Sequence, residues 1–191
     1  MKKVFIDVGC HEGYYSFIWT KDPNSFVYAF EPVPSLYNEL KKKESLHSNF
    51  KVFNYAICEV DGESTFNINT NLATCSLKDS TETSGYVISD KIVVKTKRLD
   101  TFCREEGIDK IFLMKSDAQG SDLEVVKSLG EKLKDCDRLL IEAWITPKGD
   151  NVYEDEVKKD DLVAFLAENN FELVNEAIDG NYADLTFQNL Y

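Results

Sequence analysis

The sequence predicts a single α/β domain with an open, doubly wound, mostly parallel sheet of about seven strands. Three observations predict this fold. Short apolar runs alternate with amphipathic stretches along most of the 191 residues, as strands and their covering helices do. The length is that of one domain, and no Pro/Gly/Ser-rich linker divides the chain. The last two apolar runs are joined by a short turn, so they should pair antiparallel.

The N-terminal third alternates strands with helices. Buried runs predict strands, whereas apolar residues one turn apart, such as Leu36 and Leu40, predict helices. In chain order we expect a strand at Val4–Val8, a helix at Tyr14–Thr20, a strand at Phe26–Phe30 after the turn Asp22-Pro23-Asn24, a helix at Ser35–Lys43 and a strand at Lys51–Ile57.

The middle of the chain breaks this alternation. Ser64–Asn69 alternates polar and apolar residues as a strand does, and the β-branched run Ile92–Thr96 is expected to pair with it. Between them, Asn71–Tyr86 is rich in Thr, Ser, Asp and Asn and predicts a long loop. Loops of this length inside a small domain are usually functional.

Alternation then resumes to the C-terminus. Ser121 followed by Glu124 has the spacing of a capping box, which predicts that a helix starts there. The other expected elements are a helix at Leu99–Glu106, strands at Ile111–Lys115 and Leu139–Ala143, a helix at Asp160–Asn169, and strands at Phe171–Val174 and Tyr182–Phe187 around the turn Asp179-Gly180-Asn181.

Composition limits the partners. The chain carries 22 basic and 34 acidic residues, a net charge of −12, which repels phosphate backbones and argues against nucleic acid. No apolar stretch approaches the roughly 18 residues of a membrane helix, so no membrane partner is expected. Five scattered cysteines and two histidines argue against a zinc site or a disulfide framework. With no targeting segment recognisable, we expect a cytoplasmic location.

The strongest ligand signal lies at the carboxyl ends of the first two strands, where open α/β sheets bind ligands. Asp7-x-Gly9-x-x-x-Gly13 follows the first strand and precedes a helix. Glycines there allow close approach of a ligand to the backbone. Glu31 ends the second strand, about 20 residues on, where a carboxylate accepts hydrogen bonds from ribose hydroxyls. The spacing is not the Gly-x-Gly-x-x-Gly of dinucleotide binding.

Several segments together indicate an enzyme family. They are Phe5–Gly9, Gly13–Ser16, Ala29–Pro32, Asn54–Ile57, Leu99–Phe102 and, most specifically, Met114–Val125, which contains Lys-Ser-Asp-Ala-Gln-Gly-Ser-Asp. On these residues the chain resembles the FkbM family of S-adenosylmethionine-dependent methyltransferases, over about residues 3–145. It departs from the family pattern where Ser116 and Ala118 replace apolar residues and Ser121-Asp122 replaces Ala-Glu. The resemblance implies a Rossmann-like methyltransferase sheet with an inserted β-hairpin and an antiparallel last strand, all in one domain of residues 1–191.

The resemblance also implies S-adenosylmethionine as the cofactor. It implies that Asp7, Gly9 and Gly13 surround the methionine part of the cofactor, and that Glu31, followed by Pro32, holds the ribose. Asn54 and Ala56 would lie at the adenine edge, Ser76 would help to close the site, and Asp117 would lie beside the methyl group.

Transfer to a hydroxyl needs an aligned acceptor and a base for its proton. The candidate catalytic residues are Asp117, Glu142 and His11, with Asp117 first because it ends the fourth parallel strand. Asp117 and Glu142 together could hold Mg²⁺, but the sequence has no pattern for a third ligand, so we expect no metal.

The expected function is O-methylation of a hydroxyl on a sugar or another small metabolite. Two alternatives stay open: an N-methyltransferase acting on an amine or peptide, and a cofactor-binding module without transfer. A nucleotide-binding oxidoreductase is disfavoured by the glycine spacing. Acceptor choice should lie in loops 69–90 and 148–157, which carry no readable code. The sequence does not set the oligomeric state.

Overall fold

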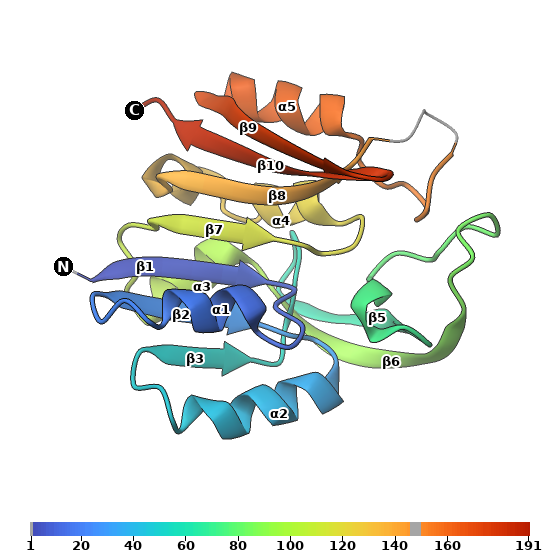
Figure 1. Ribbon diagram of the computed structural model, residues 1–191, viewed down its shortest axis with the longest axis horizontal. Helices are drawn as coiled ribbons and strands as arrows, with labels where there is room; N and C mark the ends of the chain where they lie inside the picture. The colour runs from blue at the N-terminus through green and yellow to red at the C-terminus, as the bar shows by residue number, and fades with distance from the viewer. Residues whose placement is uncertain (1, 146–149) are drawn as a thin grey trace.

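The computed structural model describes residues 2–145 and 150–191. Its main sheet has seven strands in the order β3-β2-β1-β7-β8-β10-β9 (Figure 1). They are β1 (Lys3–Val8), β2 (Ser25–Phe30), β3 (Phe50–Phe53), β7 (Leu113–Ser116), β8 (Arg138–Trp144), β9 (Phe171–Asp179) and β10 (Tyr182–Asn189). β10 runs antiparallel to both neighbours, and the other pairs are parallel. The predicted sheet, with its antiparallel last strand, is confirmed.

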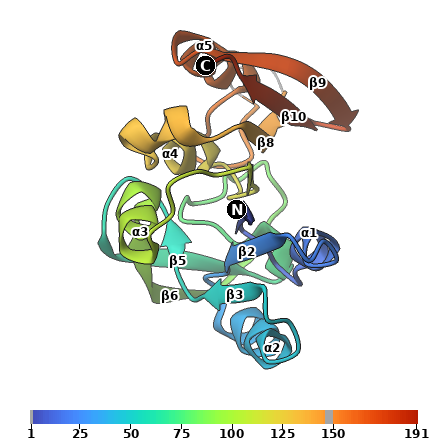
Figure 2. The ribbon, with the colours of Figure 1, turned by 90° about the vertical axis from the view of Figure 1, so that its left-hand side faces the viewer.

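Helices cover both faces of this sheet, as Figure 2 shows with the sheet seen nearly end-on. α1 (Tyr14–Trp19) and α2 (Pro34–Glu44) lie on one face, and α3 (Leu99–Glu106), α4 (Asp122–Lys127) and α5 (Lys159–Glu168) lie on the other. Short 3₁₀ helices, η1 (Leu72–Thr74) and η2 (Gly130–Asp135), complete the set. The chain winds from β1 to β3 in one direction and from β7 onward in the other, so the switch of direction falls between β1 and β7.

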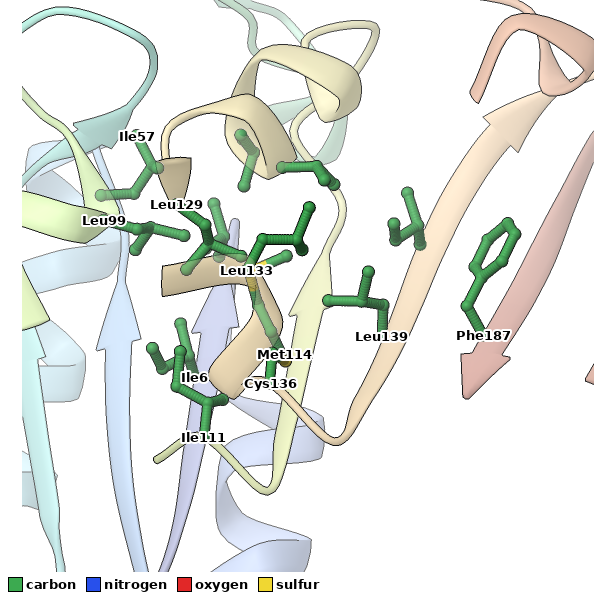
Figure 3. Close-up of a cluster of buried hydrophobic side chains, with 14 of the residues drawn as sticks. Ile6, Ile57, Leu99, Ile111, Met114, Leu129, Leu133, Cys136, Leu139 and Phe187 are labelled. Carbon is green, nitrogen blue, oxygen red and sulfur yellow. The ribbon is translucent and has the colours of Figure 1, made fainter. Parts of the chain in front are cut away.

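The alternation of side chains along the strands builds two cores. In β1, Ile6 packs with the α3–α4 side, whereas Phe5 packs with the α1–α2 side. The larger cluster runs from Ile6 across Met114 and Leu139 to Phe187 on β10 (Figure 3). Burying both faces explains why these strands read as continuous apolar runs.

The middle of the chain forms a second, smaller sheet. It consists of β4 (Ala56–Ile57), β5 (Gly62–Asn69) and β6 (Ile88–Lys97), in the order β4-β6-β5. β5 and β6 form the predicted hairpin, with Ser64 opposite Val94. The prediction of one continuous strand at Lys51–Ile57 is wrong. β3 ends at Phe53 in the main sheet, whereas β4 belongs to the second sheet and pairs with β6. The Asn54 amide stabilises this break by donating to the carbonyls of Glu31 and Pro32, at 2.8 and 3.0 Å.

The start of α4 also differs in detail from the prediction. Ser121 is the N-cap residue, but its side chain makes no capping hydrogen bond. Asp122, the first residue of the helix, instead fixes the loop before it by accepting the Ala118 amide at 2.9 Å and the Ser116 hydroxyl at 2.6 Å. Glu124 pairs with Lys78 at 2.8 Å. In the described part of the chain, the helices are too short or too polar to cross a membrane.

Candidate active site

A cavity opens at the carboxyl ends of β1, β2 and β7, between these strands, β4 and the loop around η1. Six of the predicted site residues line it: Gly9, His11, Glu31, Pro32, Ala56 and Asp117. The cavity therefore lies at the switch point of the sheet, where the element order places a ligand.

Gly9 allows β1 and β7 to meet at the cavity floor. Its φ is +67°, and a Cβ on it would lie 2.0 Å from the carbonyl oxygen of Asp117. The Asp117 amide donates to the carbonyl of Val8 at 3.1 Å, which keeps the two strand ends together. Any residue other than glycine would have to displace backbone at this point.

Glu31 directly follows β2, and two backbone amides donate to its carboxylate. Its Oε2 accepts the His11 amide at 2.8 Å, and its Oε1 accepts the Val33 amide at 2.9 Å. The residue is 4% exposed. Burial raises the pKa of Glu31 to about 7, although both backbone hydrogen bonds favour the charged form. Each oxygen retains acceptor capacity for a further donor.

Asp7 and Lys115 lie side by side in β1 and β7. Asp7 is 1% exposed, and its Oδ2 accepts the Ser16 hydroxyl at 2.6 Å. Its Oδ1 has no hydrogen-bond partner within the described residues. Burial raises the pKa of Asp7, and the nearby charge of Lys115 opposes that rise. The unpaired oxygen is thus a buried acceptor suited to a cationic donor.

A hydrogen-bonded chain starts at Asp117. Lys115 Nζ lies 3.2 Å from Asp117 Oδ2, and Gln119 Nε2 donates to Asp117 Oδ1 at 2.7 Å. The same nitrogen donates to Glu142 Oε1 at 3.1 Å. Burial first, and then the charges of Asp117 and Asp122, raise the pKa of Glu142 to about 9. Sequence analysis missed Gln119 as a site residue, although it belongs to the most specific segment of the family pattern.

Five predicted site residues lie outside the cavity lining: Asp7, Gly13, Asn54, Ser76 and Glu142. A Cβ on Gly13 would meet Phe17 at 2.7 Å and Leu40 at 2.9 Å, so this glycine serves helix packing. The Ser76 hydroxyl donates to the carbonyl of Gln119 at 2.7 Å and ties down the loop, whose neighbours Cys75 and Leu77 line the wall.

The two loops expected to determine acceptor specificity, 69–90 and 148–157, are joined by backbone hydrogen bonds. Thr81 donates its amide to Val152 at 2.9 Å, and Glu154 donates its amide to Asp79 at 2.8 Å. Residues 148 and 149 of the second expected loop lie outside the described residues. Within the described ranges, no group of three or more His, Cys, Asp or Glu residues could hold a metal ion.

The strand order and a cavity at the switch point define the class: a Rossmann-like methyltransferase fold. Three solved structures resemble the chain. The first is TrmK from M. capricolum in complex with S-adenosylhomocysteine, with a TM-score of 0.55 and 13% identity over 98% of this chain and 62% of that one. The second is fibrillarin from Aeropyrum pernix with bound S-adenosylmethionine, with a TM-score of 0.57 and 11% identity over 97% of this chain and 66% of that one. The third is the human methyltransferase 10 domain containing protein, with a TM-score of 0.55 and 13% identity over 100% of this chain and 73% of that one. The chain thus spans less than two thirds of the length of the first two.

The methyltransferase FkbM domain model matches residues 7–173, so the chain belongs to this family. Among curated proteins, none matches significantly. The cofactor of the family is S-adenosylmethionine, and three features of the site fit it. Gly9 lines the cavity and lets the end of β1 lie against the Asp117 backbone, Glu31 offers a buried carboxylate to hydroxyl donors, and Asp7 holds an unpaired buried oxygen.

Proposed function

We propose that the protein methylates a hydroxyl of a sugar or another small metabolite, with S-adenosylmethionine as the methyl donor. One observation carries the proposal: Glu31 and Asp117 line the same cavity. A carboxylate suited to ribose hydroxyls and a carboxylate suited to an acceptor proton therefore face one space.

We assign the cofactor-binding roles from the cavity lining together with the family pattern. Glu31 accepts the ribose hydroxyls, and Pro32 and Ala56 line the adenine side of the cavity. Gly9 lies in the cavity lining beside the proposed position of the methionine part. Asp7, which lies outside the lining and keeps one unpaired buried oxygen, is the proposed acceptor for the ammonium group. Gly13, Asn54 and Ser76 act indirectly, because they hold α1, the Glu31–Pro32 turn and the η1 loop in position. S-adenosylmethionine supplies an electrophilic methyl group when it is bound.

Asp117 is the proposed base for the acceptor hydroxyl. Its side chain is 32% exposed and lines the cavity, so an acceptor can reach it. Lys115 and Gln119 fix its two oxygens, which favours a constant orientation toward the hydroxyl proton. His11 also lines the cavity and is the second candidate. Glu142 is linked to Asp117 through Gln119 and is the third.

The net charge disfavours a strongly anionic acceptor. One structure of similar fold is described as a putative tRNA (m1A22) methyltransferase. This chain has a net charge of −12, which disfavours binding to a phosphate backbone. We therefore propose a small-molecule or glycan acceptor and a cytoplasmic enzyme consisting of one domain.

Isothermal titration with S-adenosylmethionine, S-adenosylhomocysteine and NAD tests the proposal. We expect the first two to bind with Kd values of about micromolar order and NAD not to bind. Incubation with polyol and amine pools, followed by measurement of S-adenosylhomocysteine, then separates O-methylation from N-methylation. Absence of binding by both sulfur compounds would overturn the proposal.

A further inference from the structure

The Gln119 side chain bridges two acidic groups that the proposed function treats separately. It follows β7 in a left-handed backbone conformation, with φ at 51°. Its amide nitrogen reaches Asp117 Oδ1 at 2.7 Å and Glu142 Oε1 at 3.1 Å. A primary amide has two N–H donors, so each carboxyl group receives one.

This arrangement leaves the amide oxygen of Gln119 in need of a donor. The hydroxyl of Tyr153 lies 2.7 Å from that oxygen and 3.0 Å from the carbonyl oxygen of Thr74. Burial raises the pKa of Tyr153 far above its ordinary value, so the phenol keeps its proton. The phenol has one proton, and the shorter contact assigns it to the Gln119 oxygen. In this orientation each polar atom of the Gln119 amide has a hydrogen-bond partner.

Tyr153 is itself rigidly held. Its side chain is fully buried, and a Cβ on Gly120 would lie 3.0 Å from its ring. Glu156 accepts the amides of Val152 and Tyr153 at 2.9 and 2.8 Å, which fixes the backbone beneath the ring. The hydroxyl is therefore presented to Gln119 from a preformed position.

We propose that Gln119 is a positioning residue that joins Asp117 and Glu142 into one unit, and that Tyr153 sets the direction of its amide. The proposal deepens the proposed function and rests on it, because it takes Asp117 as the base. Tyr153 belongs to the segment that pairs with residues 79–81. The position of the segment that contains Tyr153 thus determines the orientation of Asp117. If this segment were displaced, the side-chain amide of Gln119 could rotate.

The test uses ligand-free protein and reads two NMR signals: hydrogen exchange of the Gln119 side-chain amide and titration of the Glu142 carboxyl carbon. The variants are Tyr153→Phe, Gln119→Met and their combination. Tyr28→Phe is the matched control, because it also removes one phenol from a buried ring, and the ionisable groups around that phenol are Glu106, Lys51 and Cys103. The ionisable groups that face Glu142 are Lys115, Asp117, Asp122, Asp184, Tyr86, Tyr153 and Tyr182. Of these, the variants replace only Tyr153.

For Tyr153→Phe we expect amide exchange to become roughly tenfold faster, the effect of losing one buried hydrogen bond. The titration of Glu142 should move to higher pH, because a turned amide no longer donates to its charged form. Gln119→Met should give the same titration shift, and the double variant should add nothing further. Tyr28→Phe should match the wild type in both signals.

Two outcomes would overturn the inference. One is a Tyr153→Phe protein that loses stability but keeps wild-type amide exchange and titration. The other is additivity of the two substitutions in the Glu142 titration, since Tyr153 would then not act through Gln119. Because neither signal needs cofactor or acceptor, failure of the proposed function would appear separately, in the titration with S-adenosylhomocysteine.

Discussion

The carboxylate of Glu31 accepts the backbone amide of His11 at 2.8 Å, across 20 residues of sequence. This bond fastens the end of β2 to the glycine turn after β1. The side chain proposed to hold the ribose thus also shapes the loop beside the methionine part. Binding and loop geometry should therefore change together when Glu31 is altered.

Replacing Glu31 by Ala should weaken binding of S-adenosylhomocysteine by about 1–3 kcal/mol, because the hydroxyl donors lose a charged acceptor. Isothermal titration measures the change. Glu39→Ala, which removes an exposed carboxylate from α2, is the control and should bind normally. Unchanged affinity in a folded Glu31→Ala protein would remove this residue from the cofactor site.

Binding of S-adenosylhomocysteine should strengthen as pH rises through about 7, the pKa of Glu31. Hydroxyl donors favour the charged carboxylate, so the complex releases a proton that the free protein holds below this pH. Titrations between pH 6 and 8 measure the effect. Glu31→Gln should remove that dependence, and a variant that retained it would assign the proton to another group.

Gly9→Ala should destabilise the fold and abolish cofactor binding. Its Cβ would lie 2.0 Å from the Asp117 carbonyl oxygen, a clash that must move backbone. Gly13→Ala should cost stability but leave the cavity lining in place, because its Cβ meets the side chains of Phe17 and Leu40. Thermal unfolding and ligand titration on both variants distinguish the two roles. Equal loss of binding in both would contradict this division.

Glu142→Gln should stabilise the protein at pH 8 and have little effect at pH 5. In the folded state Glu142 keeps its proton up to about pH 9, while the unfolded chain releases it near the ordinary value of 4.5. The folded state thus binds more protons between these values, so its stability falls as pH rises there. A glutamine at position 142 keeps a side-chain oxygen that can accept from Gln119, but it does not ionise and so does not lose stability as pH rises. Thermal melts should show a gain of about 2–4 °C per kcal/mol recovered, and equal gains at both pH values would refute the titration argument.

The fold was predictable from the sequence because burial on both faces leaves a strong apolar signal in every central strand. The break between β3 and β4 was not, because Ala56 and Ile57 remain apolar and buried while changing sheets. Propensity alone cannot show that Asn54 turns its amide back onto the Glu31–Pro32 carbonyls.

In the candidate site too, the residues at strand ends were predictable and those in irregular segments were not. Gly9, Glu31 and Asp117 end strands, so the order of elements brings them together. Tyr153 lies in an irregular segment and reaches Gln119 across 34 positions, and no periodic pattern marks it. Gly13 lies against the side chains of Phe17 and Leu40, and Asn54 donates to backbone carbonyls. Neither contact can be read from the residue type alone.

The pairing of residues 79–81 with 151–154 bears on the order of folding. It consists of a few backbone hydrogen bonds between irregular segments, whereas the strands beneath it are joined by continuous ladders and bury apolar side chains on both faces. We expect the sheet to form the more stable unit and this pairing to be the part of the fold that closes last. The walls of the pocket should then be the first part to open in native-state hydrogen exchange, well before the strands beneath them.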